Sequence, residues 1–335
     1  MRALQSRRRS SVFLDQHTLK RRLVLRLKGI ESGRPLIGPA TVQIHLTDLC
    51  NLACRYCYYY APDSPNRPSG KNHLAFDLFT KVVNDCVDIK VDTLYLSGQG
   101  DPTLHPRFYD MLQYLRDRPL SVTTYSNGTF PLERCRDILL GTDRIVINLG
   151  EADRASYRAL QGRDLFVRVI KNIRELARLK PELNPNFRIE VVFITTSLNE
   201  ASRLRTENLV KKLGAHLLQQ KVAEISQHNR HIMFPDQDRA EIEGDWPPCY
   251  HGWFYSAIKL NGDVNVCCFL QRLTIGNVFK TSFKEVWGSD DYAHARGSAL
   301  TGDPFKKYHE CINCRVAWRN KEIGAQLAMY DRVRT

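Results

Sequence analysis

The sequence lacks the long apolar runs that would place it in a membrane. No stretch of its 335 residues approaches the roughly 20 apolar residues that a spanning helix needs. An export signal is missing too: Ser6–Leu14 contains consecutive arginines, but Asp15, His17 and Lys20 follow where an apolar segment is required. Core-forming residues are plentiful, since 43% of the chain is hydrophobic and 10% is aromatic. We therefore expect a folded, soluble, cytoplasmic protein.

Motifs for nucleic-acid binding are also absent, although the chain is basic. The formal net charge is +13, from 49 Lys and Arg against 36 Asp and Glu. No helix-turn-helix, aromatic ribonucleoprotein motif or zinc-finger spacing accompanies this charge. Much of it lies near the N-terminus, at Arg2, Arg7, Arg8, Arg9, Lys20, Arg21, Arg22, Arg26 and Lys28. We interpret residues 1–39 as a solvated basic extension and expect no nucleic-acid or membrane partner, although the charge suits an anionic sugar or peptide.

Cysteine, in contrast, is more abundant than packing alone explains. The chain has ten cysteines, and in a reducing compartment clustered thiols indicate metal binding before disulfides. Cys86 and Cys135 fall on apolar faces of expected helices and are interpreted as small core residues. The other eight gather in two regions, one at residues 50–57 and one at residues 249–314.

Short β-type runs alternate with helical patterns through the middle of the chain. The expected strands are Thr41–Leu46, Asp92–Ser97, Leu120–Ser126, Arg144–Asn148, Arg188–Thr195 and Ala215–Gln220. Repeated strand–helix–strand units imply parallel pairing with right-handed crossovers. We predict an α/β fold with a partial (β/α)6 barrel over residues 40–235. Its functional residues should follow the carboxyl ends of the strands.

The pattern changes after residue 235. Residues 236–248 are polar and end in prolines, which indicates a linker. The region from 236 to 320 is too small to fold on an apolar core alone, which favours a small domain stabilised by a metal cluster. Residues 321–335 are interpreted as a C-terminal tail.

Local signals within this small domain predict a hairpin and a helix. Asn261-Gly262 separates two strand-like runs, Phe254–Leu260 and Asp263–Cys268, as a two-residue hairpin turn does. Ser282–Trp287 is typical of a short helix.

The first cysteine group is Cys50-x3-Cys54-x2-Cys57, which begins four residues after the first expected strand. Three thiolates on one loop can ligate three irons of a [4Fe–4S] cube and leave the fourth iron open. A structural zinc site would need four ligands, and no histidine lies at matching spacing. The spacing therefore predicts an iron–sulfur cluster with one open coordination site.

These residues resemble the cysteine loop of the radical S-adenosylmethionine (radical SAM) superfamily, in which an aromatic residue such as Tyr56 precedes the last cysteine. The segment Leu96–Pro102 is similar to the family's Gly-Gly-Glu-Pro segment, with Asp101 where Glu is commoner. The resemblance implies that the open iron binds and cleaves S-adenosylmethionine. It further implies that the cofactor is contacted by Tyr56, Gly98, Gly100, Asp101, Ser126 and Asn148.

The second cysteine group comprises Cys249, Cys267, Cys311 and Cys314. It is similar to the SPASM/twitch extension of the same superfamily, in the shorter form with one auxiliary [4Fe–4S] cluster. Four thiolates leave no open iron, which favours electron transfer over substrate ligation. A zinc ribbon would share Cys311-x2-Cys314, but the region lacks a second Cys-x2-Cys pair.

Cys268 is left with two interpretations. Successive side chains of a strand point to opposite faces, so we expect Cys268 to point away from Cys267 and from its cluster. It is then either a small buried residue or a catalytic thiol that returns a hydrogen atom to a substrate radical.

The resemblance implies how the radical is formed but does not identify the substrate. It implies cleavage of S-adenosylmethionine to a 5′-deoxyadenosyl radical, driven by a flavodoxin- or ferredoxin-type electron donor. The implied substrate is a carbohydrate-like or aminocyclitol small molecule that is dehydrogenated or epimerised in natural-product biosynthesis. The alternatives are modification of a peptide and decarboxylation of a sugar acid. We do not expect a leader-binding domain, which is typical of peptide-modifying relatives. We also do not expect the glycine-rich tail of molybdopterin-precursor cyclases.

Overall fold

The computed structural model describes residues 14–221, 248–270, 272–303, 308, 311, 314 and 317–334. The chain forms two units. The first contains residues 45–73 and 95–221, and the second contains residues 14–44, 74–94 and the described residues from 248 onward. Strands β1 (Thr41–His45) and β2 (Thr93–Ser97) contribute to both units, because the division falls within each strand.

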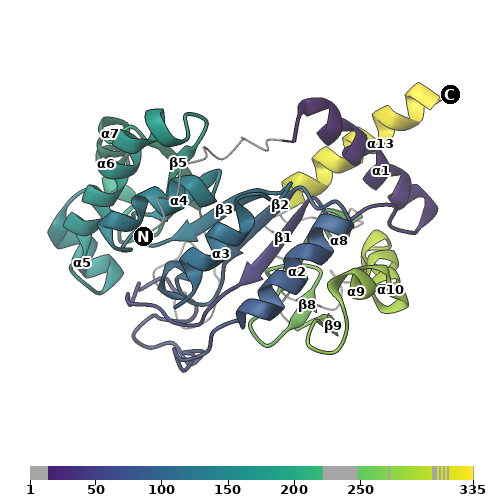
Figure 1. Ribbon diagram of the computed structural model, residues 1–335, viewed down its shortest axis with the longest axis horizontal. Helices are drawn as coiled ribbons and strands as arrows, with labels where there is room; N and C mark the ends of the chain where they lie inside the picture. Colours follow the sequence, from purple (N-terminus) through teal and green to yellow (C-terminus); the bar gives the residue numbers. More distant parts are fainter. Residues whose placement is uncertain are drawn as a thin grey trace, which may run out of the picture. The chain divides into compact units, whose positions relative to one another are not determined.

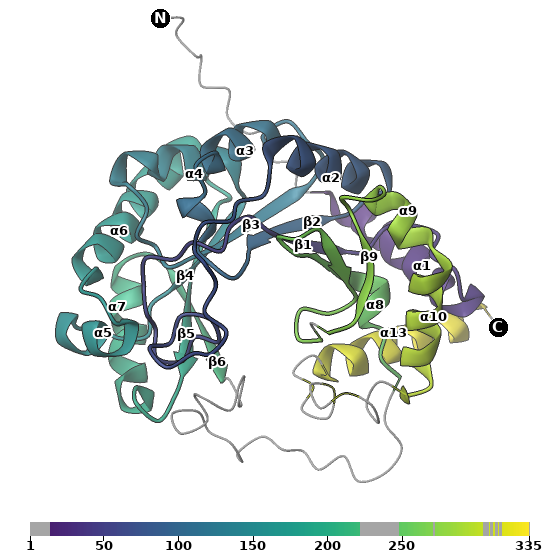
Figure 2. The ribbon, with the colours of Figure 1, turned by 90° about the horizontal axis from the view of Figure 1, so that it is seen from below.

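Parallel strands form the centre of the first unit, in the order β6-β5-β4-β3-β2. The pairs β3–β4, β4–β5 and β5–β6 are all parallel. The strands are β3 (Ser121–Ser126), β4 (Arg144–Asn148), β5 (Arg188–Thr195) and β6 (His216–Lys221). The connecting elements are η1 (Pro102–Leu104), α3 (Phe108–Leu115), η2 (Leu132–Arg134), α4 (Cys135–Gly141), α5 (Arg154–Gln161), α6 (Phe166–Leu183), η3 (Glu200–Ser202) and α7 (Arg203–Lys212). Figure 2 shows α3, α4, α6 and α7 along the outer side of these strands.

The two faces of this sheet differ in chemistry. Alternate residues of a strand point to opposite faces, and one set is fully buried and apolar: Val122, Ile145, Ile147, Val191 and Phe193. The other set includes the partly exposed Tyr95, Tyr125, Arg144 and Asn148. The helices therefore cover the apolar face, and the opposite face carries groups that can form hydrogen bonds and ion pairs.

The second unit combines a small sheet with helices from both ends of the chain (Figure 1). Its strand order is β1-β7-β8-β9. Strand β1 is parallel to β7 (Tyr255–Ile258), whereas β8 (Asp263–Asn265) and β9 (Thr274–Asn277) continue the sheet antiparallel. The helices are α1 (Gln16–Ser32), α2 (Phe76–Asp88), α8 (His251–Phe254), α9 (Phe283–Gly288), α10 (Asp290–Leu300) and α13 (Ala317–Arg334).

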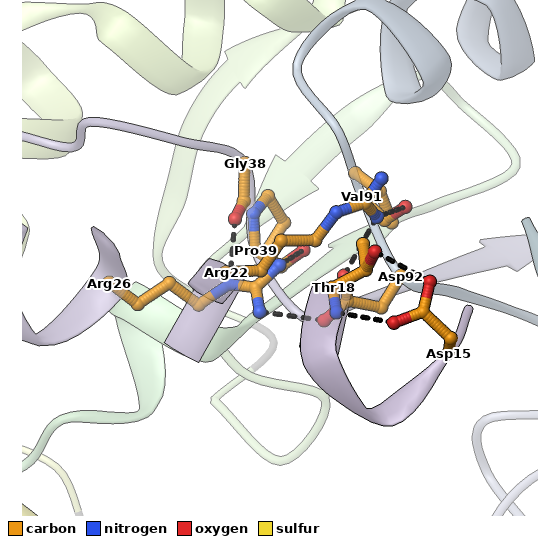
Figure 3. A network of polar contacts seen from close by, with 8 residues as sticks. All are labelled: Asp15, Thr18, Arg22, Arg26, Gly38, Pro39, Val91 and Asp92. Atoms are coloured by element: carbon orange, nitrogen blue, oxygen red, sulfur yellow. Dashed lines mark hydrogen bonds and ion pairs between the residues drawn. The ribbon is translucent and has the colours of Figure 1, made fainter. Parts of the chain in front are cut away.

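Helix α1 is tied into the second unit by a polar network that is buried around Arg26 (Figure 3). Its N-cap, Asp15, accepts a hydrogen bond from the Thr18 backbone N–H at 2.8 Å. Arg26 is buried, donates to the Gly38 carbonyl at 2.9 Å, and contacts the Asp92 carboxylate at 2.6 Å. Arg22 reaches the other oxygen of Asp92 at 2.9 Å. The prediction of a solvated basic face is therefore wrong at these two arginines, because one carboxylate and nearby carbonyls satisfy them.

Arg296 organises the aromatic core of the second unit. Its guanidinium lies 4.0 Å from the ring centroids of Trp287 and Tyr292, and 5.1 Å from that of Trp253. It also donates to the carbonyls of Gly252 and Trp287 at 3.1 and 3.0 Å. A buried arginine thus links α8, α9 and α10, so this part of the chain has more of a packed core than its length suggests.

The α/β class and the parallel, partial-barrel arrangement are confirmed. All six predicted barrel strands are present with ends within one residue, and Arg144–Asn148 and Arg188–Thr195 have the predicted bounds. The helix predicted at Ser282–Trp287 is α9, where Ser282 and Glu285 form a capping box. None of the helices in the described part of the chain is long and apolar enough to span a membrane.

The predicted hairpin is present, but its second strand is shorter than expected. Gly262 adopts φ +82° at the turn, a left-handed conformation that favours glycine. Strand β8 ends at Asn265 rather than Cys268, because its pairing with β9 shifts register between Val264 and Asn265. Helices α1, α10 and α13 were not predicted. The predicted linker, apart from Pro248, and the basic residues Arg2, Arg7, Arg8 and Arg9 lie outside the described residues.

Candidate active site and auxiliary cysteine site

The loop after β1 gathers the first three cysteines into one packed group. Cys54 and Tyr56 are buried together with Leu52 and Leu160, and Cys50 and Cys57 pack against them. A tight turn joins the last two cysteines, since the Cys57 N–H donates to the Cys54 carbonyl at 2.9 Å. The Tyr60 N–H points at the Cys57 sulfur at 3.2 Å. The predicted ligands Cys50, Cys54 and Cys57 therefore share one site in the first unit.

Burial makes these thiols hard to ionise without a cation. Desolvation raises the pKa of Cys50 to about 12, and the negative charges of Asp101 and Cys57 add to the shift. Desolvation also raises the pKa of Cys54, and the thiolates of Cys57 and Cys50 raise it further. A bound metal has the opposite effect on the pKa of these thiols, because a thiol that coordinates a metal loses its proton. Three neighbouring cysteines whose thiolates repel one another, with an N–H donor at one sulfur, fit the donor set of a cluster.

The described residues contain no group of three His, Cys, Asp or Glu side chains that converges on a single metal ion. A cube makes a different demand, because each thiolate ligates a different iron.

The glycines of the predicted Gly98-Gln99-Gly100-Asp101 segment are required by a close backbone approach. A side chain at Gly100 would place its Cβ 2.1 Å from the Leu49 carbonyl oxygen, which leaves no room for one. Gly98 has φ +152° and a Cβ position only 3.2 Å from His45. The Asp101 N–H donates to the Leu49 carbonyl at 2.8 Å. This segment therefore lies directly against the start of the cysteine loop.

Asp101 ties the end of β2 to the end of β3. Its buried carboxylate accepts hydrogen bonds from the Asn127 N–H at 2.6 Å, the Ser126 hydroxyl at 3.0 Å and the Thr103 N–H at 2.9 Å. Burial nevertheless raises the pKa of Asp101, and these hydrogen bonds oppose the shift. The Asn127 amide in turn points Nδ2 toward the Cys50 sulfur at 4.0 Å. Asp101 and Ser126 thus position the neighbouring loops through their side chains.

Gln161 is a site residue that was not predicted. It ends α5, is fully buried, and turns its Oε1 toward the Cys54 thiol and the Tyr56 hydroxyl, the latter at 3.1 Å. Asn148 donates from Nδ2 to the same Tyr56 hydroxyl at 2.8 Å. Among the described residues, Gln161 Nε2 and Asn148 Oδ1 are buried without a hydrogen-bond partner. The predicted residues Tyr56 and Asn148 therefore meet through a network that reaches Cys54.

Backbone contacts hold Gln161 in place. The Ala53 N–H donates to the Gln161 carbonyl at 3.1 Å, and the Arg55 N–H donates to the Leu160 carbonyl at 3.0 Å. Gly162 follows with φ +76°, and a Cβ there would lie 2.6 Å from the Ala53 carbonyl oxygen. Two backbone hydrogen bonds therefore join the end of α5 to the cysteine loop. Gly162 signals only the end of the helix, since glycine in a left-handed conformation commonly ends one, and it does not predict the contact of Gln161.

The auxiliary cysteines lie in the second unit. Cys249 precedes α8, and Cys267 follows β8. The pKa of Cys249 is raised mainly by burial and partly by the Cys267 thiolate, which places these two sulfurs within electrostatic reach. The Cys314 N–H donates to the Cys311 carbonyl at 3.1 Å, so the predicted Cys-x2-Cys pair forms a turn. The residues between these two cysteines lie outside the described part.

The expected orientation of Cys268 is wrong. Both Cys267 and Cys268 lie beyond the end of β8, so the alternation of a strand does not apply to them. Their thiols share a hydrogen bond, which raises the pKa of Cys267 to about 12 and lowers that of Cys268. Cys268 therefore lies beside the predicted ligand Cys267.

Comparison with known families matches two domains in the chain. The radical SAM superfamily domain matches residues 44–198, and the SPASM iron–sulfur cluster-binding domain matches residues 249–315. The first range contains Cys50, Cys54 and Cys57, and the second contains the four auxiliary cysteines.

The chain belongs to the radical SAM superfamily. Its radical SAM domain implies a [4Fe–4S] cluster and S-adenosylmethionine as cofactors, and its SPASM domain implies auxiliary iron–sulfur binding.

Similarity to curated members of the superfamily covers part of the chain. The tungsten-containing aldehyde ferredoxin oxidoreductase cofactor-modifying protein of Pyrococcus furiosus is 26% identical over 155 residues, which are 44% of this chain and 42% of that protein. The GTP 3′,8-cyclase of a Synechococcus species is 35% identical over 136 residues, which are 39% of this chain and 36% of the cyclase. This radical SAM chain therefore matches less than half the length of either relative.

Solved structures share the fold over more of the chain. Streptococcus suis SuiB bound to S-adenosylmethionine superimposes with a TM-score of 0.59 and 14% identity, covering 89% of this chain and 77% of SuiB. BtrN in complex with AdoMet and 2-DOIA gives a TM-score of 0.50 and 14% identity, covering 83% of this chain and 93% of BtrN. The fold of this radical SAM protein therefore extends beyond its matched domains.

Proposed function

We propose that this radical SAM enzyme removes a hydrogen atom from a carbohydrate-like or aminocyclitol small molecule in the course of dehydrogenation or epimerisation. The observation that carries the proposal is the polar face of the first-unit sheet. On it, the rings of Tyr95 and Tyr125 lie 5.4 Å apart, and Arg144 contacts the Glu190 carboxylate at 2.8 Å. Aromatic rings with a few placed polar and charged groups suit a substrate rich in hydroxyl and amino groups.

The likeness to BtrN supports the same proposal. The alignment with BtrN, solved with AdoMet and 2-DOIA, covers 93% of BtrN, whereas 77% of SuiB is covered. A protein of about this extent therefore accommodates a small ligand beside the cofactor. The second candidate is a peptide substrate, which SuiB, solved with its precursor peptide SuiA, favours.

When bound, the open-iron cluster and S-adenosylmethionine supply the 5′-deoxyadenosyl radical that abstracts hydrogen. The chain's own residues would hold the cluster and position the loops around it. Cys50, Cys54 and Cys57 are the thiolate donors, Asp101 aligns the loops after β2 and β3, and the Gly98–Gly100 segment brings its backbone close to the cysteine loop. Cys249, Cys267, Cys311 and Cys314 are the proposed donors to one auxiliary cluster, whose four thiolates suit electron transfer.

The proposed role of Cys268 differs between epimerisation and dehydrogenation. In an epimerase its S–H bond would break and a C–H bond would form on the opposite face of the substrate radical. The resulting thiyl radical would take an electron from the flavodoxin- or ferredoxin-type donor and a proton before the next turnover. In a dehydrogenase the substrate loses a second electron and a proton, and Cys268 has no role in bond formation.

The test is anaerobic turnover with a panel of aminocyclitols, aminosugars, sugar acids and short peptides. Formation of 5′-deoxyadenosine, with deuterium transferred into it from a carbinol carbon of a cyclitol or sugar, would support the proposal. Deuterium transfer from a peptide alone would overturn it in favour of the maturase. Wild type and Cys268→Ala in deuterated water then distinguish epimerisation, which places one solvent deuteron in the product, from dehydrogenation, which places none.

A further inference from the structure

Asn320 places a side-chain amide against a predicted auxiliary ligand. It lies in the first turn of α13 and is 3% exposed. Its Oδ1 accepts a hydrogen bond from the Tyr250 N–H at 3.0 Å, and its Nδ2 donates to the Cys249 sulfur at 3.5 Å. One carboxamide therefore binds both the backbone beside Cys249 and the thiol itself.

The orientation of this amide is fixed by chemistry. A backbone N–H can only donate, so the oxygen of Asn320 must face Tyr250. The nitrogen is then directed at sulfur, where it can donate to a thiolate as well as to a thiol. The contact therefore persists when Cys249 is deprotonated as a ligand.

Packing one turn beyond Asn320 holds α13 in this position. Ile323, one turn further along, is 3% exposed and packs in a cluster with Leu27, Ile30 and Trp253. Gly324 lies against the Tyr250 ring, at 3.7 Å from its Cε2 to the position of a Cβ. Helix α13 begins at Ala317, after the last residue, 315, of the matched SPASM domain. The helix that carries Asn320 therefore lies outside the matched range.

We propose that Asn320 is a positioning residue of the auxiliary iron–sulfur site. Its N–H holds the Cys249 sulfur in place and raises the reduction potential of the cluster that Cys249 ligates. A hydrogen bond to a ligand sulfur stabilises the extra negative charge of the reduced state, which is how surrounding groups adjust the potential of such clusters. This role rests on Cys249 being an auxiliary ligand and is independent of the substrate.

The test is a redox titration, followed by electron paramagnetic resonance, of the anaerobically reconstituted full chain. The Cys50, Cys54 and Cys57→Ala background leaves the auxiliary cluster as the sole signal. In this background Asn320→Leu removes the donor and keeps a side chain of similar size. We expect the auxiliary potential to fall by roughly the equivalent of a tenfold change in the one-electron equilibrium, about 59 mV.

The matched control is Ile323→Ala, which creates a cavity in the same helix one turn away and touches no sulfur. It should lower stability and leave the potential unchanged. An unchanged potential in Asn320→Leu, or an equal shift in both variants, would overturn the role of Asn320. Should Asn320→Leu fail to fold, Asn320→Gln offers the same amide on a longer chain, and the potential should again fall as the donor is displaced from the sulfur. Retention of the auxiliary cluster by Cys249→Ala would instead overturn the assignment of the ligand.

Discussion

In each of the two cysteine sites of this protein, a buried carboxamide side chain contacts a cysteine sulfur. The amide atom that faces the sulfur differs between the two sites. At the auxiliary site Asn320 turns its nitrogen toward Cys249. At the radical SAM site Gln161 turns its oxygen toward Cys54. The difference lies in the second partner: Asn320 is oriented by a backbone N–H, whereas Gln161 faces the Tyr56 hydroxyl. A hydroxyl can donate or accept, so it does not fix an amide as a backbone N–H does.

This difference has a chemical consequence for the radical SAM site. A cysteine that ligates iron has no proton, so an amide oxygen against its sulfur would be repelled. Rotation of the Gln161 amide would bring Nε2, which has no partner among the described residues, to the Cys54 sulfur. If the Asn148 amide rotates as well, the Tyr56 hydroxyl accepts from Gln161 and donates to Asn148 Oδ1, which is also buried without a partner among the described residues. We expect the network at the radical SAM site to reverse when the cluster is bound, and the auxiliary network to stay as it is.

The largest expected effect separates the two sites by function. Replacing Cys50, Cys54 and Cys57 by Ala should abolish formation of 5′-deoxyadenosine, because no open iron remains for S-adenosylmethionine. Cys249→Ala should instead retain slow cleavage of S-adenosylmethionine while losing the second cluster. Chromatographic measurement of 5′-deoxyadenosine checks both. Equal loss of activity in the two variants would mean that the sites are not separable.

A second prediction concerns the loop beside the cysteines. Gly100→Ala places a Cβ 2.1 Å from the Leu49 carbonyl oxygen, so the start of the cysteine loop must move. We expect at least a tenfold loss of S-adenosylmethionine affinity, measured by isothermal titration, together with less iron. Gly33→Ala is the control: its φ of +69° adds backbone strain of its own, but no atom lies within 4 Å of the new Cβ. Normal affinity in Gly100→Ala would show that the close approach has no role.

A third prediction tests the amide at the radical SAM site. Gln161→Leu should retain the first cluster but lower its reduction potential, because the donor to the Cys54 thiolate is lost. The auxiliary potential should not change. Redox titration of both cluster signals in the same sample compares the two potentials under identical conditions. A shift confined to the auxiliary signal would contradict the proposed contact of Gln161.

The smallest effect is expected away from both sites. Ser282→Ala removes the capping box of α9 and should cost about 1 kcal/mol of unfolding free energy. Chemical denaturation measures this loss. Both cluster potentials should remain at their wild-type values. A changed potential here would mean that general destabilisation, rather than a specific hydrogen bond, moves the clusters.

Much of the first unit could be predicted from sequence because its signals are local. Strand periodicity located β1–β6, and the spacing of Cys50, Cys54 and Cys57 identified the cluster loop. Gln161 could not be found in this way. Its contact with Cys54 joins residues 107 positions apart, and a glutamine at the end of a helix has no distinctive pattern.

The second unit was harder to predict because its order depends on contacts between distant segments. The buried roles of Arg22 and Arg26 depend on Asp92, about 70 residues away along the chain. Asn320 likewise meets Cys249 across 71 positions. The register shift that ends β8 at Asn265 also depends on β9 and removed the basis for placing Cys268 on a strand.

The iron content of the anaerobically reconstituted chain tests the central claim most directly. Two cubes require about eight irons and eight acid-labile sulfides per chain. The Cys50, Cys54 and Cys57→Ala variant should retain about half of each. Zinc in the second unit, or about four irons in the intact chain, would contradict the account of one cluster at each cysteine site.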